Sequence, residues 1–169
     1  NVAAEHSIEA IFARAYNISA EAAPNGAISP SGVTAVPEGG SITYTITPNV
    51  GYAVKDVLVD GESVGAVTSY VFNNVASGHG ILAIFEERTH RITASAGANG
   101  AITPGGEVTV PHGGNKTYTI TANTGYIVED VLVDGVSVGA VTSYAFTNVT
   151  ASHSISATFG VAHCITVEN

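Results

Sequence analysis

Histidine has the widest chemistry of the residues in this chain, because its imidazole can bind metal ions or transfer protons near neutral pH. Three of the six histidines, His6, His79 and His153, each stand two residues before an Ile-x-Ala-x-Phe run. A place that recurs in this way indicates a turn or strand-edge role. No His-x-x-x-His spacing supports a zinc centre, and His112 corresponds to Glu38 in another copy of the same segment. The sequence therefore predicts neither a metal site nor a cofactor.

Five carboxylates in two short stretches are the other candidate ligands, since calcium prefers oxygen donors. They are Asp56, Asp60, Glu62, Asp130 and Asp134. On an extended strand, Asp56 and Asp60 would lie roughly 13 Å apart, and a valine takes the place of Glu62 in the second stretch. These spacings favour turn-forming aspartates over a calcium site.

Nucleophiles and aromatic side chains give weaker signals. No serine or threonine stands in a nucleophile-elbow sequence, so we predict no catalytic residue and no enzyme. Cys164 is the only cysteine, which excludes a disulfide within these 169 residues. We interpret it as an ordinary strand residue, with an intermolecular disulfide as the alternative. Tyr52 and Tyr126, each after a glycine, could contact a glycan, although structural packing is the favoured interpretation.

The charge balance limits the partners. Five lysines and arginines stand against 14 aspartates and glutamates, which gives a formal net charge of −9. Such a surface repels a phosphate backbone and an anionic membrane, so we expect no nucleic acid partner. No apolar window reaches the roughly 18 to 20 residues that a membrane-spanning helix needs, and we expect no membrane insertion.

The elements that must position these residues come from an internal repeat. Residues 18–85 match residues 92–159 without a gap, with about 43 identities in 68 positions. Partial copies flank the two complete ones. The predicted divisions are the last strand or strands of a preceding repeat (1–13), repeat module A (14–87), repeat module B (88–161) and the first strand of a following repeat (162–169).

Within a copy, the pattern is that of strands separated by turns, and helical periodicity is absent. Residues 41–47 alternate, with isoleucine, tyrosine and isoleucine on one face. Asp60-Gly61 follows an apolar run and predicts a two-residue hairpin turn. The predicted fold class is all-β, as tandem small modules of sandwich or β-grasp type. Linkers of four or five residues, such as Phe85 to His90, would join them.

The last strand of each copy has two distinct faces. Ile81, Ala83 and Phe85 lie on one face and are predicted to be core. The opposite face holds Leu82 and Ile84 in module A but serine and threonine in module B. We predict that a neighbouring module packs on Leu82 and Ile84, which requires low solvent accessibility for both side chains.

The order of these motifs resembles the divergent internalin-type B-repeat. The likeness rests on Gly51-Tyr52, Val59-Asp60-Gly61 and Tyr70-Val71-Phe72, with their equivalents in module B, and it covers nearly the whole chain. The resemblance implies a bacterial or archaeal secreted or surface protein, in which such modules form stalks, spacers or adhesive segments without catalytic residues. The Gly-Trp of more typical internalin repeats is missing, because the chain has no tryptophan.

Three functional hypotheses follow. The first is a non-enzymatic extracellular or cell-surface stalk or spacer, whose partners are neighbouring repeats. The second is a filament subunit that adds strands to copies of itself through its ends. The third is an adhesin module that binds a glycan or surface receptor, for which the chain has no residue signature. The candidate residues for strand pairing between chains are Ile8, Ala10, Phe12, Ile165 and Val167.

Overall fold

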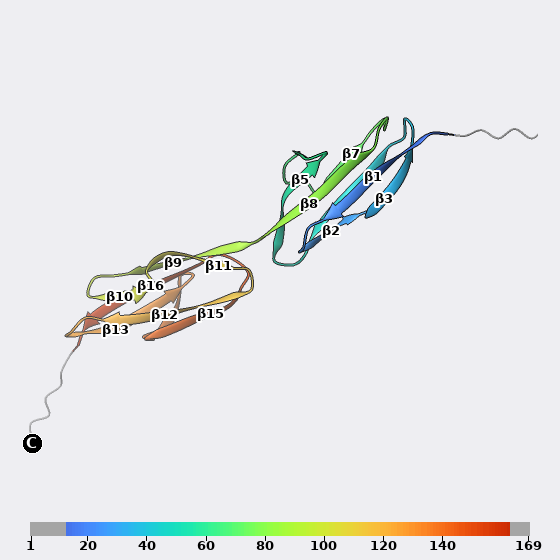
Figure 1. Cartoon of the computed structure of the whole chain (residues 1–169). Helices are drawn as coiled ribbons and strands as arrows, with labels where there is room; N and C mark the ends of the chain where they lie inside the picture. The colour runs from blue at the N-terminus through green and yellow to red at the C-terminus, as the bar shows by residue number, and fades with distance from the viewer. Residues whose placement is uncertain (1–12, 163–169) are drawn as a thin grey trace, which may run out of the picture. The chain divides into compact units, whose positions relative to one another are not determined.

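The structure, a computed structural model, describes residues 13–162, and these contain sixteen β-strands and no helix (Figure 1). The all-β prediction is thereby confirmed. The chain divides into two compact units, with the boundary between Glu86 and Glu87. One unit holds module A and the other holds module B, and each is described by itself.

The two modules have the same order of strands. Module A contains β1 (Ala15–Ala22), β2 (Gly26–Ser29), β3 (Gly32–Pro37), β4 (Ile42–Pro48), β5 (Tyr52–Val59), β6 (Glu62–Ser63), β7 (Ser69–Phe72) and β8 (His79–Glu87). Module B contains β9 (Thr89–Ala96), β10 (Gly100–Thr103), β11 (Gly106–Pro111), β12 (Gly114–Ala122), β13 (Tyr126–Val133), β14 (Val136–Gly139), β15 (Ser143–Val149) and β16 (His153–Val161).

The connection between the modules is shorter than the sequence predicts. Only Arg88 lies between the end of β8 and the start of β9, so the expected linker of four or five residues is wrong. The polar residues after Phe85 resemble a linker in the sequence, yet they continue the extended backbone as exposed strand residues.

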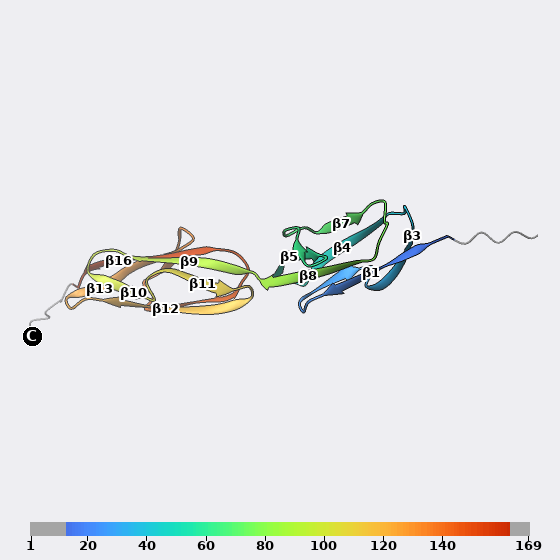
Figure 2. The ribbon, with the colours of Figure 1, turned by 45° about the horizontal axis from the view of Figure 1, so that its top comes forward.

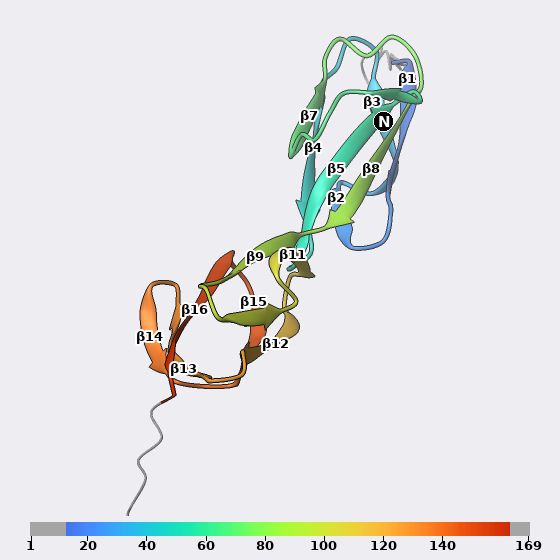
Figure 3. The same ribbon diagram turned by 90° about the vertical axis from the view of Figure 1, so that its left-hand side faces the viewer.

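Each module consists of one five-stranded and one three-stranded sheet. Module A has the orders β3-β1-β8-β5-β6 and β2-β4-β7, and module B has β11-β9-β16-β13-β14 and β10-β12-β15. The first and last strands of each module are parallel neighbours (Figures 2 and 3). Ile18 lies beside His79 in module A, and Ile92 lies beside His153 in module B. The strands that open and close each repeat thus form the centre of its larger sheet.

Both sheets of a module turn one face toward a common core, so that the module is a two-layer sandwich. Ile18 and Ile81 reach the core of module A from the larger sheet, and Tyr44 and Ile46 reach it from the smaller one. Strict alternation places these side chains inward and their neighbours outward. The predicted core run of β8 is confirmed, because Ile81 and Ala83 are buried and Phe85 packs against the same cluster.

A tyrosine lies at the centre of each core. Tyr44 and Tyr118 are fully buried, and a phenylalanine ring meets each of them edge-on at a centroid distance of 5.9 Å. Neither hydroxyl has a hydrogen-bond partner among the described residues, and burial raises the pKa of Tyr118. The two rings are therefore held by packing alone.

The hairpin predicted at Asp60-Gly61 is confirmed. Val59 pairs with Glu62, so that Asp60 and Gly61 alone form the turn. Both have a positive φ, 53° and 88°, as a type I′ turn requires. Asp and Gly adopt this conformation more readily than most residues. The turn leaves the Asp60 carboxylate at the tip of the β5–β6 hairpin.

Candidate functional site

An aspartate and a histidine meet at the tip of the β5–β6 hairpin in module A. Asp60 Oδ2 lies 2.6 Å from His79 Nδ1, and Asp60 Oδ1 accepts a hydrogen bond from the Gly80 N–H at 2.8 Å. The backbone N–H of Asp60 donates to the Gly80 carbonyl at 2.9 Å. These three bonds fasten the hairpin turn to the first residues of β8.

Module B repeats the arrangement with Asp134 and His153. Asp134 Oδ2 lies 2.7 Å from His153 Nδ1, and the Ser154 N–H donates to Asp134 Oδ1 at 2.7 Å. A phenylalanine ring also lies against each imidazole, at a centroid distance of 5.0 Å. These contacts are Phe72 with His79 and Phe146 with His153. The Asp–His pair is therefore a property of the repeat and not of one copy.

Ser77 gives module A a chain of three side chains with the connectivity of a Ser-His-Asp triad. Its Oγ lies 3.3 Å from His79 Nε2. Module B has Ala151 at the corresponding place. The part that both modules share can orient an imidazole but brings no nucleophile to it, which favours a tethering role for the pair.

Both aspartates of these pairs have a lowered pKa. For Asp60 the largest cause is the hydrogen bond from the Gly80 N–H, followed by the bond with His79. For Asp134 the bond with His153 comes first, followed by the Ser154 N–H. The carboxylates are about half-exposed, at 49% and 47%, so that solvent weakens these interactions. The ionised form is the one that holds the turn against the last strand.

We expect both modules to lose stability in acid through these two carboxylates. A carboxyl group whose pKa is lower in the folded than in the unfolded chain stabilises the fold above its ordinary value of 3.8. That contribution disappears as the pH falls through the lower, folded value. Urea unfolding at pH 7 and at several values below about pH 4 should therefore show a falling midpoint.

Asp60→Asn provides the control for this pH dependence. Asparagine tolerates the positive φ of the turn but does not ionise, so module A should be less stable at pH 7 and less sensitive to acid. Module B, with Asp134 intact, should keep its full response. Equal acid sensitivity of the Asp60→Asn and unchanged chains would contradict the assignment.

The other candidate carboxylates lie apart from the Asp–His pairs. Asp56 Oδ1 accepts hydrogen bonds from Ser63 Oγ at 2.7 Å and from the Gly65 N–H at 3.2 Å, and Asp130 Oδ1 accepts one from Ser137 Oγ at 2.6 Å. Asp56 is thus bound within its own hairpin. Among the described residues, no three histidine, cysteine or carboxylate side chains are arranged to hold a metal ion together.

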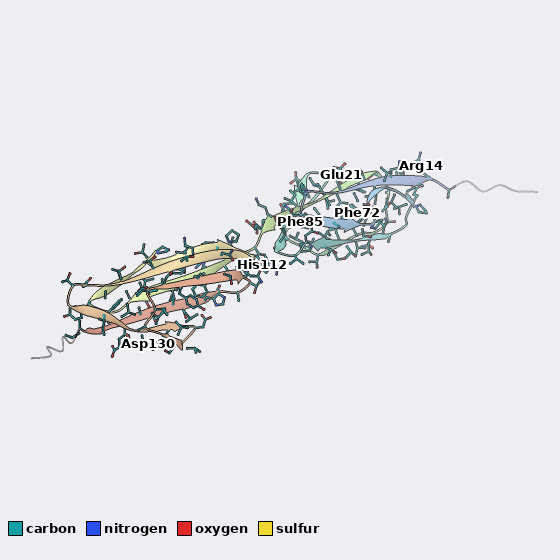
Figure 4. All side chains as sticks on the ribbon, turned by 90° about the horizontal axis from the view of Figure 1, so that it is seen from below. Arg14, Glu21, Phe72, Phe85, His112 and Asp130 are labelled. Atoms are coloured by element: carbon teal, nitrogen blue, oxygen red, sulfur yellow. The ribbon has the colours of Figure 1, made fainter. Side chains whose placement is uncertain are left out.

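The outer face of the larger sheet in module A carries a hollow of about 340 Å³. Leu58, Leu82 and Glu21 contribute to its lining; Figure 4 labels Glu21. Leu82 and Ile84, the predicted contact with a neighbouring module, lie on this face and are half-buried, and the contact itself stays a prediction. In module B, Ser154 and Ser156 stand at the places of Gly80 and Leu82, so the lining of this face is specific to module A.

The remaining candidates from the sequence fall into two groups. Tyr52 and Tyr126 are the first residues of β5 and β13, and both are half-buried. The others lie outside the described residues: Cys164 and the strand-pairing candidates Ile8, Ala10, Phe12, Ile165 and Val167.

Sequence reasoning missed the Asp–His pair, although it placed Asp60 in a turn and His79 at a strand edge. Each residue was explained by itself. The two copies match without a gap, so the separation of 19 residues is kept for every equivalent pair and does not single this one out. The available signal is weaker: the aspartate and the histidine are both identical in the two copies, at Asp60 and His79 and at Asp134 and His153.

Comparison with known families identifies the repeat. The family model of the divergent InlB B-repeat domain matches the chain twice, over residues 16–88 and 90–162. The comparison with curated proteins gave no match, and neither did the comparison with solved structures. Within residues 13–162, no helix is long and apolar enough to span a membrane. Since the two matches cover most of the chain, the chain belongs to the divergent InlB B-repeat domain family.

Proposed function

We propose that this chain is a non-enzymatic spacer segment of an extracellular or cell-surface protein. The observation that carries the proposal is the parallel pairing of the first and last strands in each module. Because the two strands run in the same direction, the chain enters a module at one end of its larger sheet and leaves at the opposite end. Each module therefore separates its point of entry from its point of exit by the length of its larger sheet.

The strand register gives the length that one module adds. β1 begins three residues before Ile18, Ile18 lies beside His79, and β8 ends eight residues after His79. About eleven steps of roughly 3.3 Å give about 36 Å from entry to exit. A stalk of such modules would project an attached domain by this amount per copy.

The independence of the modules supports the same role. The buried core residues of each module belong to that module alone. Units with separate cores and short connections have nearly additive stability. A stalk built in this way can gain or lose copies without losing the fold of the rest.

The polar features also support a spacer. The Asp–His pair ties two parts of one module together and offers no shared nucleophile. The net charge of −9 disfavours association between copies. The chain belongs to a repeat family whose modules are associated with bacterial surface proteins, and this supports the extracellular location.

Small-angle X-ray scattering of chains with one, two and four modules tests the proposal. The maximum dimension should rise by about 36 Å with each module, while light scattering reports a monomer at every concentration. Four modules with nearly the same maximum dimension as two would exclude a spacer. A mass that grows with concentration would favour the filament hypothesis.

A further inference from the structure

Two histidines from neighbouring strands meet at one end of module B. His90 is the second residue of β9, and His112 directly follows β11. His90 Nε2 lies 2.9 Å from His112 Nδ1, and the ring centroids are 5.2 Å apart with the planes inclined at 47°. Both side chains are half-buried; Figure 4 labels His112.

The backbone fixes this meeting. His90 pairs with Val110 in the antiparallel β9–β11 ladder, and the His112 N–H donates to the Arg88 carbonyl at 2.9 Å, which continues the ladder by one step. His112 lies two residues beyond Val110 and is therefore on the same face of the sheet as His90. Side chains in this diagonal relation are within reach of each other. Since Val110 is buried, the pair sits at the rim of the core.

The separation of the two nitrogens suits a shared metal ion. Two adjacent ligands of a square-planar or octahedral ion, each bound at about 2.05 Å, are about 2.9 Å apart. The observed distance between His90 Nε2 and His112 Nδ1, 2.9 Å, is that of their hydrogen bond, so a rotation of both rings with little change in this distance would turn the two lone pairs toward one ion. We propose that His90 and His112 form a two-histidine site for a divalent transition-metal ion such as Ni²⁺ or Cu²⁺, which favour square-planar or octahedral coordination.

Binding needs one rearrangement of protons. In the metal-free pair, one of the two facing nitrogens carries the hydrogen that bridges them. That proton moves to the other nitrogen of the same ring, so that both facing nitrogens present lone pairs to the metal. No net proton is released by this step, and water completes the coordination. Imidazole selects this class of ion over Mg²⁺ and Ca²⁺, which prefer oxygen ligands.

Two arginines, Arg88 and Arg91, stand close to His90 in the sequence. The guanidinium of Arg91 forms an ion pair with Glu107 at 3.0 Å, and alternation along β9 places it on the opposite face from His90. Arg88 stands across from His112 and is exposed. Its long side chain can extend into solvent, so its charge lowers the affinity without closing the site.

Module A provides a matched control within the same protein. Tyr16 and Glu38 occupy the places of His90 and His112. There, Arg14 Nη1 donates to the Tyr16 hydroxyl at 3.4 Å, and no imidazole pair exists. The proposed site is therefore specific to module B, although the backbone that could carry it is present in both modules.

The test uses the full chain with His6→Gln, His163→Gln and Cys164→Ser, which remove other side chains that bind the same ions. Titration with NiCl₂ is followed by calorimetry and by amide NMR signals. We expect one saturable site, with the first broadened signals in residues 88–92 and 108–114. His90→Tyr should abolish both the saturable binding and the broadening of these signals. The variant should still fold, because module A carries a tyrosine, Tyr16, at the equivalent place. Circular dichroism and NMR dispersion verify the fold.

A reciprocal variant sharpens the result. Tyr16→His with Glu38→His should create a second site, so that the stoichiometry rises from one to two and residues in β1 and β3 respond. CaCl₂ should cause neither response. Binding that persists in folded His90→Tyr, or broadening confined to His79, His153 or the chain ends, would overturn the proposal.

Discussion

Replacing Ile81 by alanine is expected to lower the free energy of unfolding of module A by about 2 to 5 kcal/mol. Ile81 is 2% exposed and lies beside Ala20, where β8 meets β1 in the centre of the larger sheet. Removal of three carbons there leaves a cavity that the two sheets cannot close. Urea unfolding, followed by NMR signals assigned to each module, measures the loss.

The next residue along β8 is the control. Leu82 points to the outer face and is half-buried, so Leu82→Ala should cost about 1 kcal/mol or less. Module B should keep its midpoint in both variants, because its core is separate. Ile155→Ala, at the equivalent place in module B, should lower the unfolding midpoint of module B and leave that of module A unchanged. A larger effect of Leu82→Ala than of Ile81→Ala would contradict the assignment of faces.

Gly26→Ala is expected to destabilise module A by about 1 to 3 kcal/mol through overpacking. A Cβ atom added at Gly26 would overlap the ring of Phe85, which covers this glycine from β8. The ring must then leave its place against the core. Gly80→Ala is the matched control, since a Cβ there meets no atom within 4 Å, and it should change the midpoint little.

A double-mutant cycle isolates the contact. In a Phe85→Ala background, Gly26→Ala should cost much less than it does alone, because the overlapping ring is gone. Gly100 and Phe159 form the same contact in module B and should show the same coupling. Additive effects of Gly26→Ala and Phe85→Ala would show that another contact is responsible.

Local patterns in the sequence predicted the strands and turns of this fold. Alternation over residues 41–47 corresponds to β4, and Asp60-Gly61 corresponds to the β5–β6 turn. These features succeed because side-chain alternation and positive φ act within a few residues. The ends of β8 and β9 were missed, since the charged residues at an exposed strand end look like a linker.

Contacts between distant residues could not be read in the same way. The parallel pairing of β1 with β8 joins Ile18 to His79, and no local pattern records which strands become neighbours. The His90–His112 pair is harder still to predict, because it occurs in module B only. A comparison of the two copies highlights shared residues, and module A has Tyr16 and Glu38 at these places. The Asp–His pair lies between these cases, because the repeat keeps both of its residue types but does not record that they meet.

The parallel neighbours β1 and β8 also decide how a module responds to tension. A pull applied through the chain at Ala15 and Glu87 acts along both strands in opposite senses. The backbone hydrogen bonds between Ile18–Ala22 and His79–Ala83 then bear the load together in shear, whereas a hairpin pulled at its open end would unzip one bond at a time. Resistance to forced unfolding is a matter of rate and not of equilibrium stability. Mechanical strength in each module therefore resides in the contact between its first and last strands.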